Sequence, residues 1–233
     1  MSLRSGVSAE LDGDNIAGSD AKICQAARVS TLGRLAVHTG ETSGLINYLM
    51  RNRHGSPFEH GSLSFLVEAP IFVAREFMRH RAGWSYNESS GRYSELDPVF
   101  YVPSEVRPLV QQGKPGEYEF VEGDWEQYGI TRWEHDQAYR IAWSAYRRML
   151  EAGVAKEVAR NVLPVGIFTS FYATCNPRSL MHFLSLRTKA ENSTFKSFPQ
   201  VEIAQVAQDM EAQFAEHFPL TYEAFVKNGR VAP

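Results

Sequence analysis

A polar stretch that reads RHRAGWSYNESSGRY occupies residues 79–93 and directly follows the apolar segment 70–78. It gathers three arginines, a histidine, a glutamate, an asparagine, three serines and two glycines. Ser, Asn and Gly favour turns, because their side chains compete for backbone hydrogen bonds or because glycine permits positive φ. We therefore expect a loop that presents hydroxyl, amide and carboxylate groups between arginines, and loops of this kind usually bind a ligand.

Around this loop, hydrophobic periodicity predicts several helices and a few strands. Apolar residues at helical spacing and cap residues indicate helices that begin near Asp20 and at Pro70, and further helices at residues 42–53, 133–151, 154–163 and 200–218. Asn176 and Pro177 form a cap and first-turn pair for a helix that reaches Thr188. Alternating or β-branched residues predict strands at residues 63–67, 99–102 and 167–175.

These elements predict an α+β fold in which one domain, residues 1–233, holds a small, mostly antiparallel sheet packed by several helices. Residues 1–19 are polar and rich in glycine, so we expect at most a short strand there and otherwise poor order. Residues 111–129 are charged, contain several glycines and have no period, which predicts a surface loop.

Composition narrows the classes of function. A net charge of −3 and a pI near 6.2 argue against a protein whose main partner is nucleic acid. No apolar run is long enough for a membrane span and no signal peptide is recognisable, so we expect a soluble cytoplasmic protein. Two cysteines provide neither a disulfide framework nor metal-ligand spacing, and no histidine pattern suggests a metal site.

Two nucleotide-binding motifs are absent. The chain has neither GxGxxG after a strand nor GxxxxGK[ST], so a Rossmann turn or a P-loop does not hold any nucleotide or flavin. Neither cysteine has the sequence context of an activated nucleophile.

Arg187 falls on the apolar stripe of the helix after Pro177, seven residues beyond Leu180. A cation at a core position needs an anionic partner or a route to solvent. Two interpretations remain open: the side chain extends to solvent from the last helical turn, or it faces a ligand that is, or becomes, negative.

The neighbouring cations Arg79, His80 and Arg81 also have two interpretations. Cations in the last turn of a helix stabilise its dipole, which requires no ligand. With the serine-rich loop behind them, however, guanidinium groups and hydroxyls provide what phosphate recognition requires. Arg178 and His182, one turn apart near a helix N-terminus, add a weaker indication of anion binding.

Arg-His-Arg followed by Asn-Glu-x-Ser-Gly-Arg-Tyr resembles the signature of the flavin-dependent thymidylate synthases. Five further blocks resemble the family in the same order and extend the likeness to about four fifths of the chain. They are AARVS (26–30), SPFEH (56–60), PIFVARE (70–76), EVARNVLP (157–164) and NPRSLMHFLSLR (176–187).

The resemblance implies a homotetramer with active sites shared between subunits. Such an enzyme makes dTMP from dUMP, with 5,10-methylenetetrahydrofolate as carbon donor and NADPH as reductant of a bound FAD, and uses no cysteine nucleophile. It implies that Arg187 is catalytic, because it would stabilise the pyrimidine as the N3 proton ionises. The single domain would then be a catalytic domain.

The resemblance also assigns binding residues. The positions implied for dUMP are Glu76, Arg79, Ser89, Ser90, Gly91, Arg92, Arg160 and Arg187. The positions implied for FAD are Ser56, Arg79, His80, Arg81, Glu88, Asn176, Arg178 and His182.

The chain departs from the family pattern in three places. One residue is inserted near Gly83 and Trp84, and alignment on SGRY selects Ser90 as the motif serine. Glu76 stands where many relatives carry glutamine. Residues 188–201 form a longer segment than in compact relatives.

Two other classes of function remain as alternatives. A catalytically impaired regulatory homologue would bind dUMP and FAD without turnover. An RNA-binding module would use the arginines against a phosphate backbone, which the acidic balance disfavours.

Overall fold

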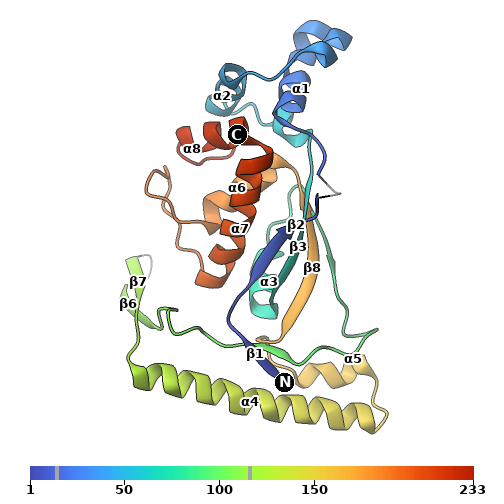
Figure 1. Cartoon of the computed structure of the whole chain (residues 1–233), viewed down its shortest axis with the longest axis vertical. Coiled ribbons are helices and arrows are strands. Elements are labelled where there is room, and N and C mark those ends of the chain that lie inside the picture. Colours follow the sequence, from blue (N-terminus) through green and yellow to red (C-terminus); the bar gives the residue numbers. More distant parts are fainter. Residues whose placement is uncertain (14–15, 115–116) are drawn as a thin grey trace. The chain divides into compact units, whose positions relative to one another are not determined.

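The computed structural model describes residues 1–13, 16–114 and 117–233 (Figure 1). The chain divides into two compact units. The first unit holds Met1–Gly6, Ala69–Ala74 and Ser89–Thr169, and the second unit holds Val7–Glu68, Arg75–Glu88 and Ser170–Pro233. Across the described ranges, no helix is both long and apolar enough to cross a membrane.

The main sheet has four strands, in the order β2 (Ser8–Leu11), β3 (Leu63–Pro70), β8 (Phe168–Cys175) and β4 (Trp84–Glu88). β2 is antiparallel to β3, and β4 is antiparallel to β8 with Trp84 opposite Cys175. Every second residue of β8, from Thr169 to Cys175, is buried, as the two-residue period of a strand requires. The predicted α+β class with a mostly antiparallel sheet is confirmed, and so are the strands predicted near residues 63–67 and 167–175.

The second unit also contains several helices. They are α1 (Asp20–Leu32), α2 (Ser43–Arg51), α6 (Pro177–Arg187), α7 (Val201–His217) and α8 (Pro219–Lys227), with 3-10 turns η2 (Gly33–His38) and η3 (Ser56–Glu59). Figure 1 shows α7 beside β2 and α6. Asp209 accepts a hydrogen bond from Ala9 N at 3.2 Å and Gln213 donates one to Ala9 O at 2.9 Å, so α7 covers the edge of β2.

Aromatic packing connects the middle of α6 to the strands of the second unit. Phe77, at the end of α3 (Ile71–Phe77), lies 4.7 Å from the Phe183 ring and 5.3 Å from the Phe171 ring, measured between centroids. Trp84 stacks on Tyr86 at an interplanar angle of 4°. Because these rings are large and mostly buried, they set the position of the chain that follows α3 relative to α6.

The first unit has its own small core. β1 (Ser2–Arg4) pairs in parallel with β5 (Val99–Tyr101), and β6 (Val110–Lys114) forms an antiparallel hairpin with β7 (Glu117–Val121). The long helix α4 (Trp125–Glu151; yellow-green in Figure 1) is followed by α5 (Lys156–Ala159) and the 3-10 turn η4 (Arg160–Val162). Phe100 stacks on Tyr139 of α4 at 4.7 Å and both pack with Ile167.

The prediction of a surface loop at residues 111–129 is wrong. The β6–β7 hairpin covers much of this range and α4 begins at Trp125, eight residues before its predicted start; Pro115 and Gly116 lie outside the described residues. Gln111, Gln112 and the first turns of α4 are exposed. Neither element therefore shows the periodic spacing of apolar residues from which helices and strands are predicted.

Three other predictions need correction. Residues 1–19 contain two strands, β1 and β2, because they pair with β5 and β3 far along the chain; Asp14 and Asn15 lie outside the described residues. The polar stretch 79–93 is not all loop, because β4 occupies part of it. The helix predicted at residues 154–163 is the short α5 followed by η4, and α8 was not predicted.

Candidate active site

Glu76, His80 and Arg187 meet in the second unit. Glu76 lies on the last turn of α3, His80 follows that helix, and Arg187 is the last residue of α6. Arg187 Nη1 donates to Glu76 Oε1, and its Nε donates to His80 Nε2 at 3.0 Å. The exposed fractions of the Arg187 and Glu76 side chains are only 19% and 24%. The cation on the apolar stripe is therefore mostly buried, and Glu76 is its anionic partner.

His80 is a neutral hydrogen-bond acceptor in this arrangement. Its exposed fraction is 8%, and its ring lies 4.8 Å from Phe183. Burial, followed by the charge of Arg187 and the proximity of His182, lowers the pKa of His80 to about 4. Since Nε2 accepts from Arg187, the proton of the neutral ring belongs on Nδ1.

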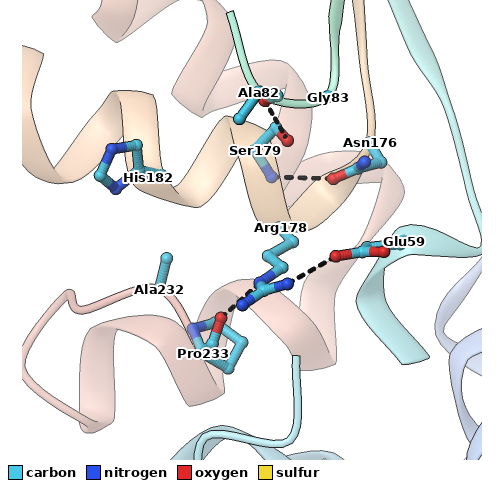
Figure 2. A pocket seen from close by; sticks show the side chains of 9 residues that line it. All are labelled: Glu59, Ala82, Gly83, Asn176, Arg178, Ser179, His182, Ala232 and Pro233. Carbon is cyan, nitrogen blue, oxygen red and sulfur yellow. Dashed lines mark hydrogen bonds and ion pairs between the residues drawn. The ribbon is translucent and has the colours of Figure 1, made fainter. Parts of the chain in front are cut away.

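A pocket of about 470 Å³ lies at the N-terminus of α6 (Figure 2). Its lining residues are Glu59, Ala82, Gly83, Asn176, Arg178, Ser179, His182, Ala232 and Pro233. The N-terminal end of a helix attracts anions, because its first N–H groups have no partner within the helix. The pocket is therefore suited to a ligand that carries negative charge.

Asn176 shapes the pocket from the N-cap position of α6. Its Oδ1 accepts from Ser179 N at 2.8 Å, and Ser179 Oγ donates to Ala82 O at 2.9 Å. Gly83 has φ of +70°, and a Cβ at this position would overlap Ser179 Oγ. Only glycine allows the chain to turn into β4 so close to α6.

Arg178 is held by two groups that the sequence analysis did not assign to the site. Its Nε donates to Pro233 O at 2.6 Å and its Nη1 donates to Glu59 Oε1 at 2.6 Å (Figure 2). Glu59 belongs to the SPFEH block, which was the available signal in the sequence. Ala232 and Pro233 carry no motif, so local sequence could not have indicated them.

The structure brings only part of the implied FAD set together. Asn176, Arg178 and His182 line the pocket, and the His80 ring lies 6.4 Å from the His182 ring. The other implied residues, Ser56, Arg79, Arg81 and Glu88, do not line it and are exposed elsewhere in the second unit.

Arg79 and Arg81 follow the end of α3 at Phe77. Glu76 therefore lies on the last turn of α3, whereas Arg79 lies beyond the helix. Within residues 1–13, 16–114 and 117–233, neither arginine side chain has an ion-pair or hydrogen-bond partner. Exposed guanidinium groups without partners remain able to bind phosphate.

The remaining implied dUMP residues lie in the first unit. Arg92 Nε pairs with Glu157 Oε2 at 2.8 Å, and Lys156 Nζ donates to Tyr93 O at 3.1 Å. These bonds connect the serine-rich turn, which includes Ser89, Ser90 and Gly91, to α5, and Arg160 begins η4 directly after α5. Arg92 and Glu157 are exposed by 54% and 52%, so this pair contributes little stability and can exchange for a ligand.

Ser90 Oγ accepts from Arg92 N at 3.3 Å, whereas Ser89 Oγ lies 3.3 Å from Thr169 Oγ1. The two serines therefore have different surroundings in the turn. Among the described residues no group of three or more His, Cys, Asp or Glu could hold a metal ion.

Comparison with known proteins identifies relatives over nearly the whole chain. The profile of the family described as thymidylate synthase complementing protein matches residues 14–220. The chain is 60% identical to a flavin-dependent thymidylate synthase of Streptomyces avermitilis, over 100% of this chain and 96% of that protein. It is 52% identical to a flavin-dependent thymidylate synthase of Tropheryma whipplei (strain TW08/27), over 92% of this chain and 91% of that protein.

Two solved structures of one methylase are similar to this chain over its whole length. The crystal structure of a UMP/dUMP methylase, PolB from Streptomyces cacaoi, bound with 5-Br dUMP, superposes with a TM-score of 0.93 at 48% identity and covers 100% of both chains. A second structure of that methylase, bound with 5-Br UMP, gives a TM-score of 0.92 at 47% identity, over 100% of this chain and 99% of that one. The chain belongs to the family of flavin-dependent thymidylate synthases.

Proposed function

We propose that this protein methylates dUMP to dTMP, with 5,10-methylenetetrahydrofolate as carbon donor and FAD reduced by NADPH. Family membership carries this proposal. The ligands bound in the related methylase structures, 5-Br dUMP and 5-Br UMP, support a uridine nucleotide as the substrate. We further propose a cytoplasmic homotetramer in which residues 1–233 act as one catalytic domain and subunits share active sites.

The pocket at α6 suits part of a flavin dinucleotide. Its volume of about 470 Å³ lies within the usual range for ligand sites, and a helix N-terminus and Arg178 offer donors to anionic groups. We assign Asn176, Arg178, His182 and the adjacent His80 to this cofactor, and retain Ser56, Arg79, Arg81 and Glu88 as proposed contacts. When bound, the flavin supplies the redox chemistry, and the protein supplies orientation and electrostatics.

Arg187 is the proposed catalytic residue. Glu76 and His80 each accept one N–H of its guanidinium, which restricts the side chain to one orientation. A cation fixed in a half-buried position stabilises negative charge that develops on a pyrimidine when N3 loses its proton. Glu76 and Arg79 from the same unit, and Ser89, Ser90, Gly91, Arg92 and Arg160, complete the proposed dUMP set.

The test is an anaerobic assay of the purified protein with dUMP, methylenetetrahydrofolate, NADPH and FAD, in which flavin absorbance and dTMP are followed together. UMP replaces dUMP in a parallel reaction. We expect flavin reduction and dTMP formation in the parent protein, loss of dTMP by a factor of about 10²–10³ in Arg187→Ala, and no change in the control Lys22→Ala, which alters an exposed residue of α1.

Two outcomes would contradict the proposal in different ways. A parent protein that binds dUMP and FAD but forms no dTMP is the impaired regulatory homologue. A parent protein that takes up no FAD is not a flavin enzyme at all.

A further inference from the structure

Three parts of the chain, Glu59, Gly55 and the segment 231–233, surround the guanidinium of Arg178 at the pocket of α6. We call them the Arg178 frame. Arg178 donates on one side to the carboxylate of Glu59 and on the other to the backbone oxygen of Pro233, each at 2.6 Å (Figure 2). These bonds use Nε–H and one Nη1–H of a guanidinium that has five N–H donors. The other donors stay available to a ligand in the pocket that Arg178 lines.

The segment 231–233 is itself held in place. Arg53 Nη1 donates to Val231 O at 2.6 Å and lies 3.4 Å from Ala232 O. Just before this segment, Arg230 is buried and its guanidinium bonds to both carboxylate oxygens of Glu211, at 2.7 and 2.8 Å. The buried bidentate pair at one end of the segment and Arg53 along its length fix the Pro233 oxygen that accepts from Arg178.

Gly55 allows this arrangement by lacking a side chain. A Cβ at position 55 would lie 2.5 Å from Nε and Cζ of Arg178 and 2.8 Å from Pro233 O. The backbone of Gly55, with φ of −76° and ψ of −33°, is open to any residue, so contact with Arg178 and Pro233 is the constraint, not backbone strain.

We propose that Glu59, Gly55 and the segment 231–233, held by Arg53, are positioning elements that preorganise Arg178 for the anionic part of the flavin cofactor. This inference rests on the proposed function. An arginine side chain on the surface loses rotamer freedom when it binds a ligand, and Arg178 is 44% exposed. Here the frame restricts the side chain before the ligand arrives, so binding costs less entropy.

The frame has a rival interpretation with the opposite consequence. Glu59 and Pro233 could compete with the ligand for Arg178, and their removal would then tighten cofactor binding. The positioning proposal requires the reverse, and it also requires that glutamine can replace Glu59, because an amide oxygen accepts the same hydrogen bond without a charge.

The experiment titrates FAD into the full chain, follows flavin fluorescence, and measures the dissociation constant and the dissociation rate. We expect Glu59→Ala and Arg53→Ala each to raise the FAD dissociation constant about three- to tenfold, the size expected for one immobilised long side chain. Glu59→Gln should stay within about twofold of the parent protein, because it keeps the acceptor. Binding of dUMP, measured by calorimetry, should not change in these variants.

A glycine pair adds a matched control. Gly55→Ala should weaken FAD binding like Glu59→Ala, whereas Gly44→Ala should not, because nothing lies within 4 Å of a Cβ at position 44. Equal or tighter FAD binding in Glu59→Ala and Arg53→Ala would overturn the inference and leave the proposed function intact. Absence of FAD binding in the parent protein would overturn both.

Discussion

Arg187 donates its Nε–H to Nε2 of His80 across 3.0 Å. This hydrogen bond joins the last residue of α6 to the middle residue of the Arg-His-Arg signature. The histidine that the resemblance implies for the flavin thus also supports the arginine implied for the pyrimidine. The two proposed ligand sets share this hydrogen bond, so a change at His80 affects Arg187.

Replacement of His80 by phenylalanine tests this bond. His80→Phe keeps a ring against Phe183 but removes the acceptor, which leaves a donor of the half-buried Arg187 without a partner. We expect turnover with dUMP to fall about tenfold, a loss of about 1.4 kcal/mol in transition-state stabilisation. Steady-state kcat measurement checks this, with the exposed His38→Phe as the control; unchanged kcat in His80→Phe would show that the bond has no catalytic role.

The stability of the fold should depend on pH through His80. Its pKa is about 4 in the folded chain and near 6.5 when unfolded, so between these values the unfolded chain binds the extra proton. Stability is therefore fully present above pH 6.5 and is lost as the pH falls toward 4, by up to about 3 kcal/mol. Urea unfolding of the parent protein and His80→Phe at pH 4.5 to 7 measures this, and the slope should be smaller in the variant.

We expect the charge of Glu76, itself a proposed dUMP contact, to lower the affinity for dUMP on balance, because it neutralises Arg187. Glu76→Gln keeps an oxygen that accepts from Arg187 Nη1 but removes the negative charge beside it. We expect the dissociation constant for dUMP to fall about threefold or more in this variant, because a charge-assisted bond to the ligand replaces an internal ion pair. Calorimetry with dUMP checks this, and weaker binding would show that Glu76 itself contacts the nucleotide through its charge.

Glu76→Ala should behave differently from the glutamine variant. It leaves the half-buried Arg187 without its carboxylate, so we expect a loss of stability of about 1–3 kcal/mol. A urea midpoint equal to that of Glu76→Gln would contradict the role of Glu76 as the partner of Arg187.

The early start of α4 depends on a capping box. Asp124 accepts from Gln127 N at 2.8 Å, and the Gln127 side chain accepts from Asp124 N at 2.8 Å. Asp124→Ala should lower stability by about 1 kcal/mol. Urea unfolding checks this against Glu126→Ala, an exposed neighbour in the same turn; equal effects of the two would mean that the cap is not specific.

Local chemistry alone predicted several elements correctly. Asn176 as cap and Pro177 as first-turn residue mark the start of α6, and the aromatic and β-branched run at residues 167–175 marks β8. In both places, the residues that form the element also carry its signal. The fold class and the family were also recognisable because residues within single segments indicate them.

Elements without an apolar period escaped prediction. The β6–β7 hairpin and the first turns of α4 are exposed, so their sequence carries no pattern of burial. β1 and β2 form because partners distant in the chain complete their hydrogen bonds. Pairing of this kind is a property of the folded chain and not of the segment.

By itself the sequence determined the family and the fold class and indicated the arginines proposed to bind ligands, because these depend on residue types and their order. Only the tertiary structure decided what holds those arginines. Glu76 and His80 lie 111 and 107 residues before Arg187 in the chain, and Glu59 and Pro233 reach Arg178 from points 119 and 55 residues away. Such partners are set by chain packing, because hydrogen bonds act over about 3 Å of space whatever the separation in sequence.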